Sequence, residues 1–189
     1  MIIAVKEKDR VIVGCCYSEL VIGLTEGDYI NEENTPMTFL EDGKFVVMSN
    51  PSRVSDILIY DDKFLSIEVS PKAIINDTIP YIKRALKENQ YAISRNGTWD
   101  NSVTYVDGTR IYDIDPTFGF REVDDYVCHG IDVNVVMGVL DATEGLSAEK
   151  RILNAVSFAS KIKKVDWFPL IIVDTKTREV KHIMKEETR

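Results

Sequence analysis

The sequence predicts an α+β fold in which pairs of helices pack on mainly antiparallel β-sheets. Three observations support this prediction. Strand-like and helix-like segments follow each other in the order strands, two helices, strands, two helices, strands. No linker-like composition interrupts the 189 residues, so residues 1–189 are expected to form a single domain. A strand-like run begins at Ile2, although chain ends usually fray unless the fold holds them.

Most expected strands occur in hairpins, where short apolar runs flank a polar turn. The first hairpin joins β-branched runs at 2–5 and 11–13. Residues 45–48 are all apolar, which predicts a central strand covered on both faces. The strands within 103–123 alternate, which predicts one solvated face, and residues 63–69 are compatible with a short strand. The full set of expected strands is 2–5, 11–13, 37–40, 44–49, 103–106, 110–114, 120–123, 165–174 and 179–184.

Four helical segments are expected between these strands. Pro51 lies near the first turn of the first helix, and Ser70-Pro71 provides the N-cap and first turn of the second. Pro80 predicts a kink inside the second helix, or a helix that instead begins near Thr78. The last two helices follow from apolar residues at helical spacing. The expected helices cover approximately 51–58, 71–86, 131–142 and 148–162.

Composition and charge exclude several classes of function. The formal net charge of −8 disfavours a partner held through phosphates and docking on an anionic membrane surface. No apolar run approaches the roughly 18–20 residues that a membrane-spanning helix needs. Charged residues at 6–10 also interrupt any apolar core that a signal peptide would require, so a cytoplasmic location is expected.

The cysteines and histidines form no recognisable metal or nucleophile motif. An odd count that includes adjacent Cys15 and Cys16 does not indicate a disulfide framework, so these two and Cys128 are interpreted as small buried hydrophobes. His129 is interpreted as a turn residue and His182 as exposed. No glycine-rich phosphate loop, CxxC pair or HExxH helix occurs, so no cofactor or metal is expected. Three acidic groups are interpreted as solvated surface or, alternatively, as sites for a hard cation. They are Asp61-Asp62, Asp113 with Asp115, and Asp124-Asp125.

Five passages in sequence order carry a resemblance to a known family. They are Ile2-Ile-Ala-Val with Val11-Ile-Val-Gly, Lys44-Phe-Val-Val-Met-Ser with Arg53-Val-Ser-Asp-Ile-Leu, Thr109-Arg-Ile-Tyr-Asp-Ile-Asp-Pro, Tyr126-Val-Cys-His-Gly with Val136-Met-Gly-Val-Leu, and Phe168-Pro before Leu170-Ile-Ile-Val. This ordered set resembles the N-terminal nucleophile (Ntn) hydrolases, specifically the proteasome β-subunit and the HslV peptidase. The resemblance covers almost the whole chain. It implies a four-layer αββα sandwich of two mainly antiparallel sheets flanked by helix pairs.

The family's chemistry uses an N-terminal threonine, whose hydroxyl attacks the substrate while its own α-amine takes the proton. The resemblance places that threonine one residue before Met1, and Met1 itself has no hydroxyl or thiol. The family's acidic residue corresponds to Cys16, its lysine to Pro36, and the serine of its Gly-Ser-Gly motif to Ile131. None of these four positions therefore carries the side chain that the standard mechanism uses.

Two further features agree with this loss. Residues 25–41 contain no lysine, and a one-residue shift would only replace Cys16 by Cys15 at the acidic position. The expected oxyanion donor falls within Ser49-Asn50-Pro51, where the proline has no N–H to donate.

The resemblance therefore predicts a proteasome/HslV-like protein that has lost the threonine peptidase chemistry and acts as an oligomerising or binding protein. Its expected partners are copies of the same chain, in a dimer or ring formed through the helix layers. The alternative is a divergent peptidase or amidohydrolase whose nucleophile is Cys15, Cys16 or Ser18. A residual pocket is expected around Met1, Cys16, Ser49, Asn50, Gly130, Asp132 and Asn134.

Overall fold

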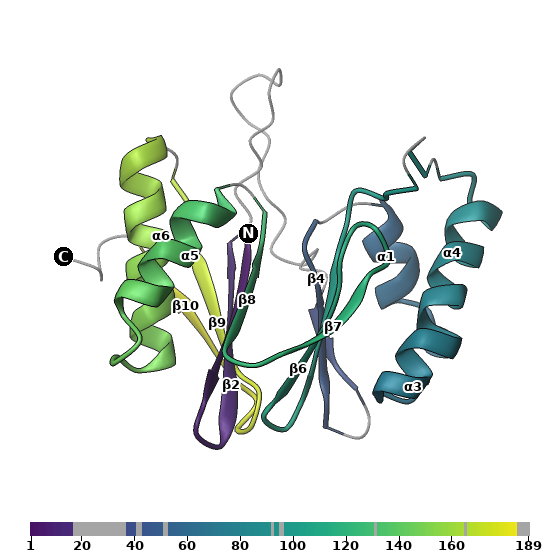
Figure 1. Cartoon of the computed structure of the whole chain (residues 1–189), viewed down its shortest axis with the longest axis horizontal. Helices are drawn as coiled ribbons and strands as arrows, with labels where there is room; N and C mark the ends of the chain where they lie inside the picture. Colours follow the sequence, from purple (N-terminus) through teal and green to yellow (C-terminus); the bar gives the residue numbers. More distant parts are fainter. Residues whose placement is uncertain are drawn as a thin grey trace.

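The structure, a computed structural model, consists of two β-sheets that lie face to face between two layers of helices (Figure 1). It describes residues 1–16, 37–40, 43–50, 53–91, 93–94, 97–130, 132–164 and 166–184. The predicted four-layer αββα sandwich is confirmed.

The first sheet holds the beginning of the chain in an interior strand. Its strand order is β10-β9-β2-β1-β8, and every neighbouring pair is antiparallel. Because β1 lies between β2 and β8, ladders on both sides fix the start of the chain, which is why this end does not fray. The strands are β1 (Ile2–Glu7), β2 (Arg10–Cys16), β8 (Tyr126–His129), β9 (Leu170–Asp174) and β10 (Glu179–Ile183).

The second sheet is a meander of five antiparallel strands in the order β3-β4-β5-β6-β7. All four residues of β4 are buried, which confirms that this strand is covered on both faces. The strands are β3 (Met37–Phe39), β4 (Phe45–Met48), β5 (Val103–Asp107), β6 (Arg110–Ile114) and β7 (Phe120–Val123).

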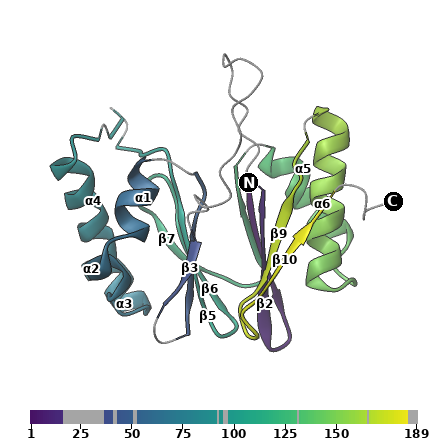
Figure 2. The same ribbon diagram turned by 180° about the vertical axis from the view of Figure 1, so that it is seen from behind.

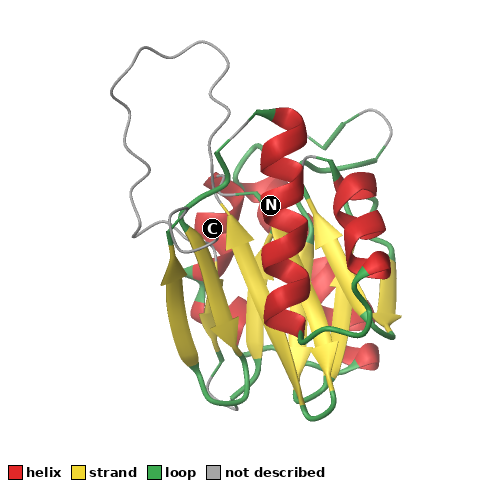
Figure 3. Cartoon of the chain, turned by 90° about the vertical axis from the view of Figure 1, so that its left-hand side faces the viewer, coloured by secondary structure: helices red, strands yellow, loops and turns green. Residues whose placement is uncertain are grey.

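Each sheet has its own helix layer on its outer face (Figure 2). Helices α5 (Val133–Ala142) and α6 (Ala148–Lys163) cover the first sheet, and Figure 3 shows them in front of its strands. Gly14 on β2 allows this close approach, because an added Cβ would lie 2.4 Å from a methyl group of Ile152. The second sheet is covered by α1 (Arg53–Ile59), α2 (Asp62–Leu65), α3 (Pro71–Ala73), the π-helical turn η2 (Ile74–Thr78) and α4 (Ile79–Glu88).

Strand alternation divides the core into three apolar layers. Ile2 and Ala4 of β1 face the second sheet, whereas Ile3 and Val5 face α5 and α6. A third layer lies between the second sheet and α1–α4. The turns of the β1–β2 and β5–β6 hairpins lie at one end of the molecule, and Met1 lies at the opposite end (Figure 1).

Two local predictions are wrong, and one alternative is confirmed. The 63–69 segment begins within α2 instead of forming a strand, because Asp61 accepts a hydrogen bond from the amide of Lys63 and caps a helix there. Ser70 caps α3 as predicted, and the π-helical turn η2 separates α3 from α4, which begins directly after Thr78; the alternative that a helix begins near Thr78 is therefore confirmed. The strands β5 and β6 have no solvated face, because the first sheet covers the side predicted to be open.

Candidate functional site

The start of β1 continues the ladder with β2 as far as the first residue. The α-amine of Met1 donates to the carbonyl oxygen of Cys16 at 2.5 Å, and the amide of Cys16 donates to the carbonyl oxygen of Met1 at 2.8 Å. Burial lowers the pKa of this α-amine, with the neighbouring Cys16 and Cys15 acting weakly in the opposite direction. The α-amine is thus buried and donates a hydrogen bond within the β1–β2 ladder.

The side chains at this end of β1 are aliphatic or thioether groups. Met1 packs in the layer under α5 and α6 together with Ile3 and Cys16. Ile2 faces the second sheet, and it is flanked on the neighbouring strands by Cys15 and His129. The inter-sheet face therefore presents a hydrocarbon side chain where β1 begins.

The two candidate thiols of β2 point in opposite directions, as adjacent strand residues do. Cys16 lies in the helix-side layer, and burial raises the pKa of its thiol to about 12. Cys15 lies in the inter-sheet layer, where its Sγ is 3.9 Å from Sδ of Met37. Both are fully buried, and Cys128 is buried as well, which confirms their interpretation as core residues.

Gly130 and Asp132 close this end of the first sheet. Gly130 has a φ of +117°, and an added Cβ would lie 2.9 Å from Cα of Met1, so only glycine fits. Asp132 adopts a left-handed conformation with a φ of +65°, and its Oδ1 forms an ion pair with Lys163 Nζ at 2.8 Å. Its Oδ2 is buried without a hydrogen-bond partner in the described part of the chain. Asn134 is exposed in the first turn of α5.

Ser49 and Asn50 belong to the second sheet and are used to hold the start of α1. Ser49 Oγ and the amide of Asn50 both donate to Oδ1 of buried Asn101 at 3.0 Å. The side-chain amide of Asn101 donates back to the carbonyl oxygen of Asn50 at 2.8 Å. The structure thus brings Met1, Cys16, Gly130 and Asp132 together and gives Ser49 and Asn50 a separate network. Ser18, Pro36, Pro51 and Ile131 lie outside the described residues.

One polar pair was missed from the sequence. His129 is a strand residue of β8 and not a turn residue, and its Nε2 lies 2.6 Å from Oδ1 of Asp113 on β6. Asp113 is fully buried, not solvated, and also contacts Thr104 Oγ1 at 3.3 Å and Arg121 Nε at 3.0 Å. The pair joins the two sheets close to Ile2. Strand alternation at Cys128 and His129 was the available signal, since it separates the two side chains onto opposite faces.

The described residues contain neither a metal-binding cluster nor a membrane-spanning helix. These residues include no group of three or more histidine, cysteine, aspartate or glutamate side chains that could hold a metal ion. Within the same part of the chain, no helix combines the length and apolar character needed to cross a membrane.

The fold has known counterparts, although no protein-family model and no curated protein matches the sequence. BPH from Thiobacillus denitrificans has a TM-score of 0.72 and 16% identity, covering 97% of this chain and 98% of that chain. Anbu from Pseudomonas aeruginosa, described as a helical assembly, has a TM-score of 0.70 and 12% identity, covering 98% and 87%. HslV from Trypanosoma brucei has a TM-score of 0.59 and 14% identity, covering 96% and 99%. The chain therefore has the proteasome-like fold of the N-terminal nucleophile hydrolases.

Proposed function

We propose that this chain is a proteasome/HslV-like protein without the N-terminal threonine peptidase chemistry, and that it acts as an oligomerising or binding protein. The observation that carries the proposal is the start of β1. Ile2 fills the inter-sheet face there, Met1 points under the helices, and the α-amine is bonded to the carbonyl of Cys16. A nucleophile needs a hydroxyl or thiol together with a base that can reach it, and neither Met1 nor Ile2 supplies one.

The supporting positions agree with this proposal. The side chain of Cys16 is a buried thiol in the helix-side layer, so it does not provide the negative charge of the family's acidic residue. Residues 25–41 lack the lysine that the resemblance calls for.

An apolar patch on the helix layer of the first sheet supports assembly. Met137 on α5 is 40% exposed and Phe158 on α6 is 48% exposed. The ion pair between Asp132 and Lys163 joins the start of α5 to the end of α6. Met137 and Phe158 each lie five residues from this ion pair, about 7.5 Å along their helices. The two side chains therefore lie at the same height along the helix pair. Ile162, one turn further along α6, is also exposed. Exposed apolar side chains that gather on one face indicate a protein interface, whereas single ones are common on any protein surface.

The helical assembly of Anbu from Pseudomonas aeruginosa supports the same proposal. That protein shares this fold, and copies of it associate. We extend this behaviour to the present chain as a self-assembly through α5 and α6.

A divergent hydrolase is the competing hypothesis, and the His129–Asp113 pair is the observation that favours it, since His–Asp pairs serve as general bases. Cys15 is the candidate thiol on the same inter-sheet face. However, Cys15 and His129 pair with opposite sides of Ile2, so their strands are about 9.5 Å apart. Direct proton transfer between them is excluded at that spacing, and we therefore favour the non-catalytic protein.

Native mass measurement tests the proposal. We expect the wild-type chain to form a dimer or larger assembly, and Phe158→Lys to reduce it to a monomer because a charge at the patch cannot be buried. Tyr60→Lys is the matched control: Tyr60 is an exposed aromatic residue of the opposite helix layer, and its substitution should leave the assembly intact. A wild-type monomer, or dissociation by Tyr60→Lys alone, would refute self-assembly through α5 and α6.

A further inference from the structure

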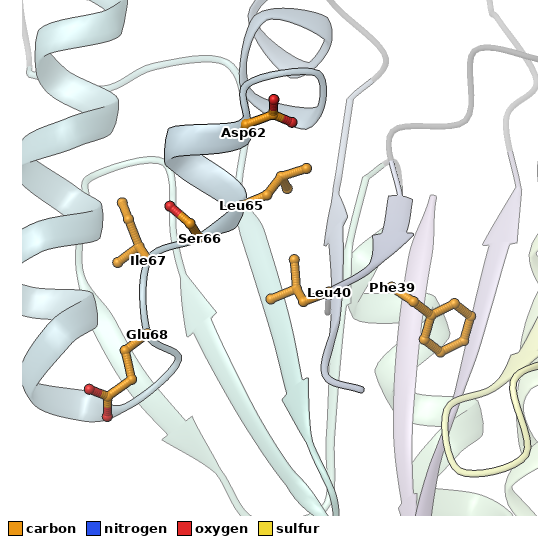
Figure 4. A pocket seen from close by; sticks show the side chains of 7 residues that line it. All are labelled: Phe39, Leu40, Asp62, Leu65, Ser66, Ile67 and Glu68. Atoms are coloured by element: carbon orange, nitrogen blue, oxygen red, sulfur yellow. The ribbon is translucent and has the colours of Figure 1, made fainter. Parts of the chain in front are cut away.

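A cavity of about 600 Å³ lies beside the second sheet. It opens between the edge strand β3 and the segment that connects α2 to α3 (Figure 4). Volumes of 300–1,000 Å³ are typical of ligand sites. Its lining residues are Phe39, Leu40, Asp62, Leu65, Ser66, Ile67 and Glu68.

The strand that borders this cavity has an open edge. Among the described strands, β3 pairs only with β4. Leu40 donates its amide to the carbonyl of Lys44 at 2.7 Å, so Leu40 and Thr38 direct their backbone groups toward β4. The backbone groups of Phe39, which lies between them, point to the other side. A strand edge of this kind accepts an added strand.

The cavity combines apolar walls with acidic ends. Leu40, Leu65 and Ile67 supply hydrocarbon surface. Asp62 at the start of α2 and Glu68 on the connecting segment lie on opposite sides of Leu65 and Ile67 (Figure 4). Neither carboxylate has an ion-pair or hydrogen-bond partner among the described residues.

The adjacent Asp61, in contrast, has hydrogen-bond partners within the fold. Asp61 accepts a hydrogen bond from Tyr81 Oη at 2.5 Å and another from the amide of Lys63. Its charge is therefore used within the fold, whereas the charges of Asp62 and Glu68 remain available for a ligand.

We propose that this groove binds an extended peptide segment in which every second side chain faces the groove and these side chains are in turn basic and apolar. The backbone of the segment pairs with the open edge at Phe39, as in β-strand addition, while its apolar side chains enter between Leu40 and Leu65. Its basic side chains meet Asp62 and Glu68. Charge complementarity favours this occupant, and the groove lies in the other helix layer from the surface on α5 and α6.

The probe is a fluorescein-labelled ten-residue peptide with both ends blocked, in which lysine and valine take turns at every second position and threonine occupies the positions between them. Fluorescence anisotropy at low ionic strength should show binding to the full chain at least tenfold tighter than that of the glutamate–valine counterpart. Methylation of alternate backbone nitrogens of the peptide should reduce binding at least tenfold, because it removes the donors needed for strand addition. Equal binding of the lysine and glutamate peptides, or no effect of methylation, would overturn the proposal.

Variants of the protein locate the site. The double substitution Asp62→Asn with Glu68→Gln should weaken binding of the lysine–valine peptide about 5- to 10-fold, as expected for two partly solvated ion pairs at low salt. The matched control is Asp77→Asn with Glu88→Gln, which removes two exposed charges from the same helix layer outside the groove and should change binding less than twofold. Equal weakening in both variants would show diffuse attraction to an acidic protein and overturn the site. A native mass that falls in the Asp62/Glu68 variant would assign the groove to a second copy of the chain, and would also overturn it.

Discussion

The start of β1 and the groove beside β3 differ in what their polar groups do. At the start of β1 the α-amine of Met1 is bonded to Cys16, and Gly130 packs against the Met1 backbone. In the groove, Asp62 and Glu68 have no partner among the described residues, and β3 pairs with β4 alone among the described strands. The start of β1 is thus part of the core, whereas the groove keeps two carboxylates and a strand edge that the described part of the fold does not use.

The reactivity of the thiols should distinguish most clearly between a packed core and a catalytic site at the start of β1. Because burial raises the Cys16 pKa to about 12, native Cys16 should react with iodoacetamide at pH 8 about a thousandfold more slowly than in urea. Burial raises the pKa of Cys128 to about 11, so its slowing should be about a hundredfold. Mass spectrometry of labelled peptides measures both rates. Fast native labelling of Cys16 would contradict the core interpretation.

The same pKa shift has a consequence for stability. A thiol with a raised pKa in the folded state binds its proton more tightly there than in the unfolded chain. The stabilisation is complete below the unfolded pKa and is lost as pH rises toward the folded value. The free energy of unfolding should therefore decline between about pH 9 and 12, less steeply in a Cys16→Ala variant.

Gly130 tests how tightly the start of β1 is closed. Gly130→Ala should destabilise the protein by about 3 kcal/mol, because a positive φ and contact with the Met1 backbone both oppose a Cβ. Gly138→Ala is the matched control, since this glycine of α5 has open space around it and should gain about 0.5–1 kcal/mol. Urea unfolding compares the two. A neutral Gly130→Ala would mean that this end is looser than described.

Asp113 tests the polar pair between the sheets. Asp113→Asn should cost about 2–3 kcal/mol, because His129 and Arg121 lose a buried charged acceptor. Glu122→Gln, an exposed change on the adjacent strand β7, should alter the free energy of unfolding by less than about 0.5 kcal/mol. Equal effects of the two substitutions would contradict the interpretation that Asp113 stabilises the contact between the two sheets.

The smallest effect is expected at the ion pair of Asp132 and Lys163. Lys163 is nearly half exposed, so a double-mutant cycle with Asp132→Asn and Lys163→Gln should give a coupling free energy below about 1 kcal/mol. A coupling of 2 kcal/mol or more would show that this pair is a structural clamp at the start of β1.

Patterns in neighbouring residues predicted most of the fold. The predictions that failed concern features that depend on contacts between segments distant in the sequence. The β-branched runs of β1 and β2 and the Ser70 cap were readable because their causes are nearby in sequence. The burial of Asp113 was not, because the side that covers it belongs to a sheet formed by distant segments. The groove at Leu40 likewise depends on packing between β3 and a segment more than twenty residues away.

The most direct test of the account is the mass of the protein after incubation with epoxomicin. BPH from Thiobacillus denitrificans, solved in complex with this compound, serves as the positive control. We expect the mass of the present protein to stay unchanged under conditions in which BPH forms its complex with the compound, because neither Met1 nor Ile2 supplies a nucleophile. A gain in mass located at the start of β1 would contradict the proposed loss of N-terminal chemistry.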